Sequence, residues 1–124
     1  MRTPEGWDLT GKKAVISADR RGWTKFFSSA LAEAGADVAI IGSENSDMEE
    51  AGNKASGYGR KVITQTTNLM SKTSIDKSIQ SINDDFGTID ILVNNAKVNF
   101  GKRFEEVTES EFDTLMDFNL KSMF

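Results

Sequence analysis

Short apolar runs alternate along the chain with longer segments in which apolar residues recur every three or four positions. The short runs are rich in β-branched residues and bounded by turn residues, a pattern typical of buried strands. The predicted strands cover residues 13–17, 37–42, 61–66 and 89–94. The alternation is uninterrupted, because the only proline is Pro4, near the N-terminus.

The segments between these runs have the spacing of amphipathic helices. The expected helices cover residues 26–34, 46–55, 75–86 and 108 to the end of the chain. Gly35 and Gly87 follow the first and third of them, where glycine commonly ends a helix. The last helix opens with a capping box, in which Thr108 and Glu111 satisfy each other's free backbone donors.

Strands and helices in this alternation predict right-handed βαβ crossovers and a parallel sheet covered by helices on both faces. The expected fold class is therefore α/β, a Rossmann-type sheet of about four strands. This corresponds to a truncated half of a doubly wound domain. We assign residues 1–124 to one such domain, incomplete at its C-terminus, since 124 residues suit a single domain.

Composition narrows the classes of function. The chain is 38% hydrophobic and 27% charged, the balance of a globular protein, and its net charge of −4 argues against a nucleic-acid partner. No apolar stretch is long enough to cross a membrane, and the first seven residues lack a signal-peptide core. Without Cys or His, thiolate and imidazole metal sites are excluded, so we expect no metal and a cytoplasmic location.

The chemistry of an open parallel sheet is expected beyond the carboxyl ends of its strands. Three segments follow the first, second and fourth strands there, residues 17–24, 42–45 and 94–101. Asn68 follows the third strand and belongs to the same edge.

These segments carry a resemblance to the short-chain dehydrogenase/reductase family. Residues 8–12 and 30–38 resemble the family's opening, and residues 90–96 resemble its Asn-Asn-Ala-Gly signature. Residues 112–121 resemble the helix that carries the asparagine of the family's catalytic tetrad, which is Asn119 in this chain. The resemblance covers nearly the whole chain. It implies an NAD(P)-dependent oxidoreductase that transfers hydride between nicotinamide and an alcohol or carbonyl substrate.

The phosphate loop departs from the family's Thr-Gly-x-x-x-Gly-x-Gly pattern, and only its middle glycine is present, as Gly22. Ala18 stands at a turn expected to need positive φ, at a cost of about 1 kcal/mol. Thr24 adds a branched side chain where the helix approaches the sheet, and Lys97 replaces the glycine of the Asn-Asn-Ala-Gly signature. Losses of a few kcal/mol would lower cofactor affinity by on the order of a hundredfold.

The resemblance still assigns cofactor-binding residues. They are Ser17, Arg21, Gly22, Trp23, Ser43, Asn68, Leu69, Asn95 and Ala96. Between NAD and NADP the sequence favours NADP slightly, because Ser43 and Arg21 suit a 2′-phosphate and no acid stands directly at the end of the second strand. Glu44 is the residue that would favour NAD instead. The plain alternative for Arg20 and Arg21 is an ordinary solvated loop.

The family's remaining catalytic residues, a serine, a tyrosine and a lysine, have no counterpart at the right spacing in this chain. The one tyrosine, Tyr58, lies in a glycine-rich turn, so the chain alone is expected to be inactive. Asn119 is the only candidate catalytic residue, and its alternative role is a structural amide that braces the sheet. The family also implies a small-molecule substrate and a homo-oligomer for the full-length protein.

Three functions are therefore open. The first is part of an oxidoreductase, for which residues 95–106 favour a sugar-acid or polyol substrate, as in gluconate 5-dehydrogenase-like members. The second is a non-catalytic nucleotide-binding module with a degenerate phosphate loop. The third is a cofactor-independent relative, like the halohydrin dehalogenases. Dinucleotide binding separates the first two from the third.

Overall fold

A computed structural model describes Pro4 and residues 6–124 of the chain. Residues 1–3 and 5 lie outside the described residues. They belong to the N-terminal segment in which the sequence shows no signal-peptide pattern. Four parallel strands form one sheet in the order β3-β2-β1-β4. The strands are β1 (Lys13–Ser17), β2 (Asp37–Gly42), β3 (Val62–Thr66) and β4 (Ile91–Val93). The predicted α/β fold class is confirmed.

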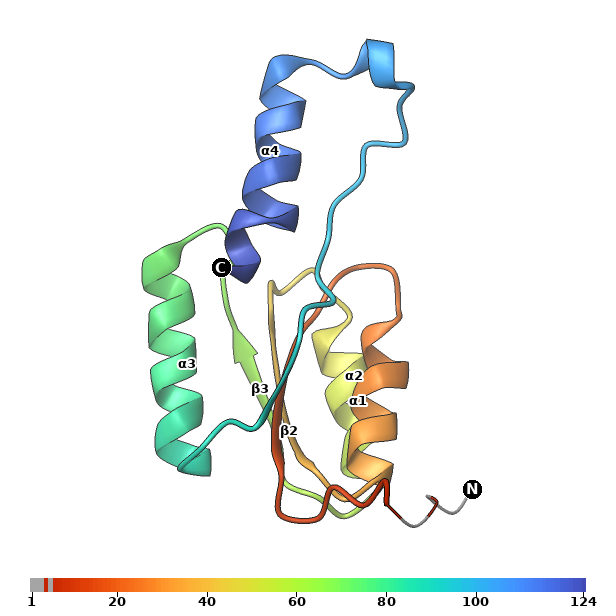
Figure 1. Ribbon diagram of the computed structural model, residues 1–124, viewed down its shortest axis with the longest axis vertical. Helices are drawn as coiled ribbons and strands as arrows, with labels where there is room; N and C mark the ends of the chain where they lie inside the picture. Colours follow the sequence, from red (N-terminus) through yellow and green to blue (C-terminus); the bar gives the residue numbers. More distant parts are fainter. Residues whose placement is uncertain (1–3, 5) are drawn as a thin grey trace.

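Helices cover both faces of the sheet (Figure 1). Their bounds are α1 (Thr24–Glu33), α2 (Met48–Ser56), α3 (Lys72–Phe86) and α4 (Glu109–Asn119), with two short 3₁₀ turns, η1 (Phe104–Glu106) and η2 (Lys121–Met123). Figure 1 shows α1 and α2 on one face, α3 on the other, and α4 beyond the carboxyl ends of the strands. No helix within the described part of the chain combines the length and the apolar character that crossing a membrane requires.

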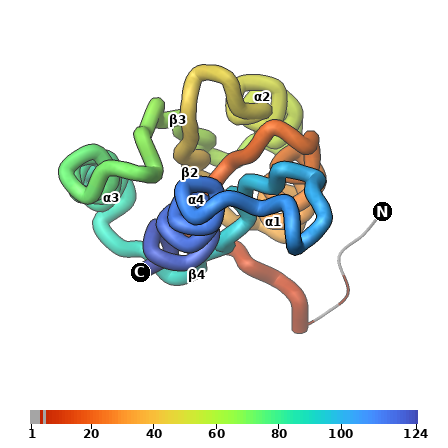
Figure 2. The backbone as a smooth tube through the Cα atoms, turned by 90° about the horizontal axis from the view of Figure 1, so that it is seen from above, coloured from red at the N-terminus to blue at the C-terminus, as the bar shows by residue number. Residues whose placement is uncertain are grey.

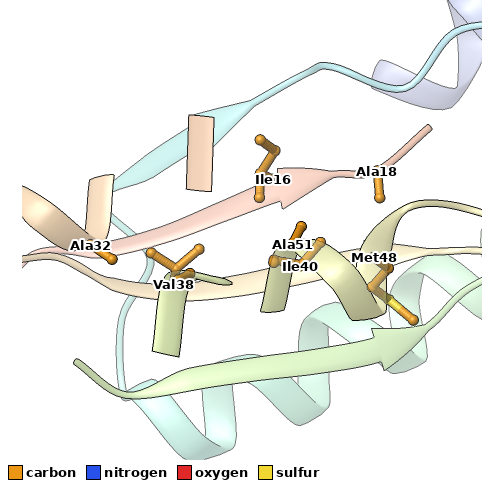
Figure 3. Close-up of a cluster of buried hydrophobic side chains, with 8 residues drawn as sticks. Ile16, Ala18, Ala32, Val38, Ile40, Met48 and Ala51 are labelled. Atoms are coloured by element: carbon orange, nitrogen blue, oxygen red, sulfur yellow. The ribbon is translucent and has the colours of Figure 1, made fainter. Parts of the chain in front are cut away.

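The core has two halves, because alternate strand residues face opposite sides of the sheet. Ile16, Val38 and Ile40 point towards α1 and α2, where they meet Ala51 and other small side chains (Figure 3). Val15, Ala39 and Ile41 point the other way, towards Ile82 and Phe86 of α3. The small side chains let α1 and α2 approach the sheet closely, and the larger ones of α3 fill the opposite face.

The two edges of the sheet are β3 and β4, while β1 is central. Ala14 of β1 pairs with Val38 on one side and with Ile91 on the other. β4 is shorter than the predicted 89–94, and Asp90, just before it, bonds Lys13 through both its N–H and its carboxylate, each at 2.8 Å. Leu92 of β4 is 56% exposed.

Contrary to the sequence prediction, the last helix does not run to the end of the chain. α4 ends at Asn119, and Leu120 takes φ −118° and ψ −60°, outside ideal helical geometry. The chain continues as η2, and the Ser122 hydroxyl donates to the Phe118 carbonyl.

Candidate functional site

A cavity of about 730 Å³ opens at the carboxyl edge of the sheet. Residues from the segments after all four strands line it, together with Phe118 of α4. Figure 2 views this edge from above, with α4 over the sheet between α3 on one side and α1 and α2 on the other. The cavity thus lies where parallel α/β sheets bind their ligands.

The loop after β1 is not strained at Ala18, contrary to the sequence prediction. The Ala18 N–H donates to the Ile41 carbonyl at 2.8 Å, which continues the β1–β2 pairing, and no described residue other than glycine has a positive φ. The turn comes later, at Gly22, with φ +79°. Gly42 makes room for the extra methyl, since a Cβ built on Gly42 would lie only 3.0 Å from the Ala18 Cβ.

Thr24, which replaces the last glycine of the family's loop, is fully buried. Its Oγ1 accepts from Asn95 Nδ2 at 3.0 Å and from the Asp19 N–H at 3.4 Å. The branched side chain expected to crowd the helix therefore also ties the loop after β1 to the end of β4.

Ser17, Asn95 and Ala96 belong to the same bonded group. Ser17 Oγ accepts from the N–H groups of Asn95 and Ala96, both at 3.0 Å, and Asn95 Nδ2 also donates to the Ser17 carbonyl at 3.1 Å. These three predicted cofactor-binding residues join β1 to β4 beneath the cavity and do not line it. The structure thus gives them a bracing role, whatever else they bind.

The loop contains an ion pair that was not predicted from the sequence. Asp19, with a side chain 2% exposed, accepts from Arg21 Nε at 2.8 Å and from the Arg21 N–H at 2.9 Å. Both residues line the cavity, and so does Arg20. The available signal was the two-residue spacing of Asp19 and Arg21, since an aspartate commonly bonds the backbone two residues on.

Three other predicted residues also line the cavity, namely Ser43, Asn68 and Leu69. Ser43 is exposed, whereas Leu69 is 8% exposed and packs under the cavity. Asn68 is held by two hydrogen bonds, one from its side chain and one from its backbone. Its Oδ1 accepts from the Met70 N–H at 3.0 Å, and its N–H donates to Ser74 Oγ at 2.9 Å. Lys97 is exposed and lines the cavity, as its position in the Asn-Asn-Ala signature led us to expect.

Asn119 pairs with the backbone of the loop after β4. Its Oδ1 accepts from the Val98 N–H at 2.8 Å, and its Nδ2 donates to the Val98 carbonyl at 2.9 Å. Val98 lines the cavity, so Asn119 acts on the cavity through the backbone it holds. Asn119 thus ties α4 to the loop after β4, and its catalytic role stays a prediction.

Gly22 and Trp23 lie in the loop without lining the cavity. Trp23 is 54% exposed and contacts Phe26 and Phe27 of α1, with ring centroids 5.9 Å and 6.5 Å apart. Within the described part of the chain, no three His, Cys, Asp or Glu side chains are grouped so as to hold a metal ion.

Comparisons with known proteins agree with this geometry. Residues 12–124 match the family described as short chain dehydrogenase. Gluconate 5-dehydrogenase of Gluconobacter oxydans is 27% identical, over 100% of this chain and 48% of its own length. The 2-dehydro-3-deoxy-D-gluconate 5-dehydrogenase of Pseudoalteromonas atlantica is 33% identical, over 97% of this chain and 48% of its own length.

A solved structure from Burkholderia cenocepacia, titled as a putative dehydrogenase with bound NADP, superposes with a TM-score of 0.81. It is 28% identical and covers 93% of this chain and 45% of its own. The chain thus spans about half the length of the relatives it matches.

Proposed function

Since the chain belongs to the short chain dehydrogenase family, we propose that its cavity binds NAD or NADP for an oxidoreductase reaction. The observation that carries the proposal is the cavity itself, lined from all four strand ends of a parallel sheet. Arg20, Arg21 and Lys97 line it and supply positive charge for a phosphorylated ligand.

The residues present fit a dinucleotide. Arg21 and Ser43 line the cavity and would contact the 2′-phosphate of NADP, and Asn68 with Leu69 would contact adenine. Gly22 keeps its positive φ just before α1, so the pyrophosphate would meet the N-terminus of that helix. Asn95 and Ala96, which join β4 to Ser17 beneath the cavity, would lie under the nicotinamide ribose. We therefore propose NADP as the preferred cofactor.

The bound nicotinamide would supply hydride transfer to or from an alcohol or carbonyl group. We propose a sugar acid or a polyol as substrate, which the name of the similar Gluconobacter oxydans enzyme supports. Asn119 would hold the Val98 backbone in place beside the reacting groups. Tyr58 lies in the turn between α2 and β3, at the amino ends of the strands and opposite the cavity, so we expect no turnover from residues 1–124 alone.

Titration of the chain with NADPH and with NADH, followed by calorimetry, tests the cofactor proposal. We expect saturable binding of both and tighter binding of NADPH. Arg21→Ala should weaken NADPH binding by about tenfold and NADH binding by less, because a charged contact to the 2′-phosphate is lost.

The control is Arg60→Ala, an exposed arginine at the amino end of β3, which should change neither affinity. Absence of saturable binding would contradict the dinucleotide proposal. Tighter binding of NADH would contradict the NADP preference and point to Glu44.

A second candidate is a nucleotide-binding module without catalysis, or a relative that has lost its cofactor. The buried Thr24 in place of a loop glycine is the observation that favours it. Retained dinucleotide binding excludes the cofactor-independent form. We also propose a cytoplasmic location and a homo-oligomer, for which exposed Phe112 and Met116 on α4 offer contact surface.

A further inference from the structure

Two carboxylates already bond backbone donors of the phosphate loop. Asp19 Oδ1 accepts from the Arg21 N–H at 2.9 Å, inside the loop. Asp47 Oδ2 accepts from the N–H of Thr24, the first residue of α1, at 3.2 Å. In dinucleotide-binding folds this loop and this helix N-terminus are the groups that receive the pyrophosphate.

Asp47 is placed to act on α1 and not on its own helix. It precedes α2 as the N-cap residue, yet its side chain makes no capping bond to α2. Its N–H donates to the Asp19 carbonyl at 2.7 Å, which fixes the carboxylate against the N-terminus of α1. Its second oxygen, Oδ1, is buried without a hydrogen-bond partner among the described residues.

A carboxylate at a helix N-terminus satisfies the same free amide and the same positive dipole as a phosphate would. An anionic ligand that approaches this helix therefore meets a negative charge already in place. Asp19 acts similarly on the side chain of Arg21, whose guanidinium it neutralises through Nε at 2.8 Å. The two carboxylates thus reduce the attraction for anions at the backbone and at Arg21, one of the two arginines of the loop.

We propose that Asp19 and Asp47 are internal anions that weaken the binding of phosphate groups at this loop. In this account they set the affinity of the cavity for its ligand, a role that rests on the proposed dinucleotide site. Weakened cofactor binding, which the sequence predicts from the altered loop, would then follow also from two identifiable charges. It should be reversible by single substitutions that keep the loop's hydrogen bonds.

Asp19→Asn and Asp47→Asn test the proposal, because each removes a charge and keeps an oxygen that accepts the same backbone N–H. Each should tighten NADPH binding by about fivefold, the size of a charge effect at a helix end. Each should also increase the rise in melting temperature that inorganic pyrophosphate produces, since a ligand that binds the native state stabilises it.

The matched control is Glu49→Gln, which removes an exposed carboxylate from the first turn of α2. It should change neither readout. If Asp47→Asn does not fold, Asp47→Ser replaces it, because serine keeps a capping oxygen without the charge.

The two ligands separate this inference from the proposed function. Tighter pyrophosphate binding in the Asn variants supports the internal anions even if no variant binds NADPH, a result that would refute the dinucleotide site alone. Unchanged or weaker binding of both ligands in both Asn variants overturns the internal anions, and the dinucleotide site still stands if the wild type binds NADPH. Failure of every variant to bind either ligand overturns both.

Discussion

At the scale of single residues, Thr24 shows how a departure from a family pattern can be absorbed. The residue is fully buried, and its hydroxyl accepts from the Asn95 side chain at 3.0 Å. Thr24→Val keeps the shape and removes this acceptor, so it should lower the free energy of unfolding by about 1–3 kcal/mol. Urea denaturation measures the change. Thr24→Ser keeps the hydroxyl and should lose less, and an equal loss in both variants would contradict a role for the hydrogen bond.

Asp37 makes stability depend on pH. Burial by itself would raise its pKa, but hydrogen bonds from the Lys13 ammonium and the Lys61 N–H lower the pKa below the ordinary 3.8. A carboxyl group whose pKa is lower in the folded state stabilises the fold at pH values above its unfolded-state pKa. This stabilisation is lost as the pH falls through its folded-state pKa. Between about pH 5 and pH 3, the free energy of unfolding should therefore fall more steeply in the wild type than in Asp37→Asn.

Denaturant titrations across this pH range test the expectation. Asp113→Asn, at an exposed carboxylate of α4, serves as the control and should follow the wild type. Parallel curves for the wild type and Asp37→Asn would exclude the contribution of Asp37.

Residue partners were the least predictable part of the site. The sequence placed Ser17 and Asn95 at the carboxyl edge of the sheet, and the structure shows that they bond each other although they are 78 positions apart. Strand pattern fixes which edge a residue occupies, but its partner depends on how closely two loops pack. The strain predicted at Ala18 is absent for a similar reason, since Gly42, distant in the sequence, leaves space for the Ala18 methyl.

At the scale of elements, Asn119 joins α4 to the loop after β4 by two hydrogen bonds to Val98. Asn119→Ala should release this loop, so the Val98 amide should exchange its hydrogen about tenfold faster, the equivalent of one lost hydrogen bond. Hydrogen exchange followed by NMR or mass spectrometry reports the difference. Asp113→Ala, on an exposed position of the same helix, should leave exchange at Val98 unchanged. Unchanged exchange in Asn119→Ala would show that the loop is held by other contacts.

Elements with strong local signals were predictable, and their ends less so. The capping box of α4 is confirmed, with Thr108 Oγ1 accepting from the Glu111 N–H at 3.2 Å and Glu111 Oε2 from the Thr108 N–H at 3.0 Å. Both hydrogen bonds of this motif join residues only three positions apart, so the local sequence is enough to predict it. The end of α4 at Asn119 is not predictable in this way, because the apolar spacing continues past Asn119 into η2.

At the scale of the whole molecule, the sheet has an apolar parallel edge at β4. Leu92 is 56% exposed there, and an unpaired edge strand is a site for pairing with another chain. The chain should therefore self-associate, and Leu92→Lys should shift it towards monomer in sedimentation velocity experiments, because a charged edge disfavours pairing. Tyr58→Lys adds the same charge in the turn before β3 and should not. A wild-type chain that stays monomeric at high concentration would count against this expectation.

The sheet order has a consequence for how the chain folds during synthesis. β1 can pair with β2 soon after both have left the ribosome. β3 can then pair with β2, because the two strands are close in sequence: Lys61, just before β3, bonds Asp37 of β2 across 24 positions. The second partner of β1 is β4, which is synthesised much later, since Asp90 bonds Lys13 across 77 positions. Until then the β4 side of β1 stays unpaired on the nascent chain. Contacts of such long separation slow folding, so of the four described strands β4 is expected to join the sheet last.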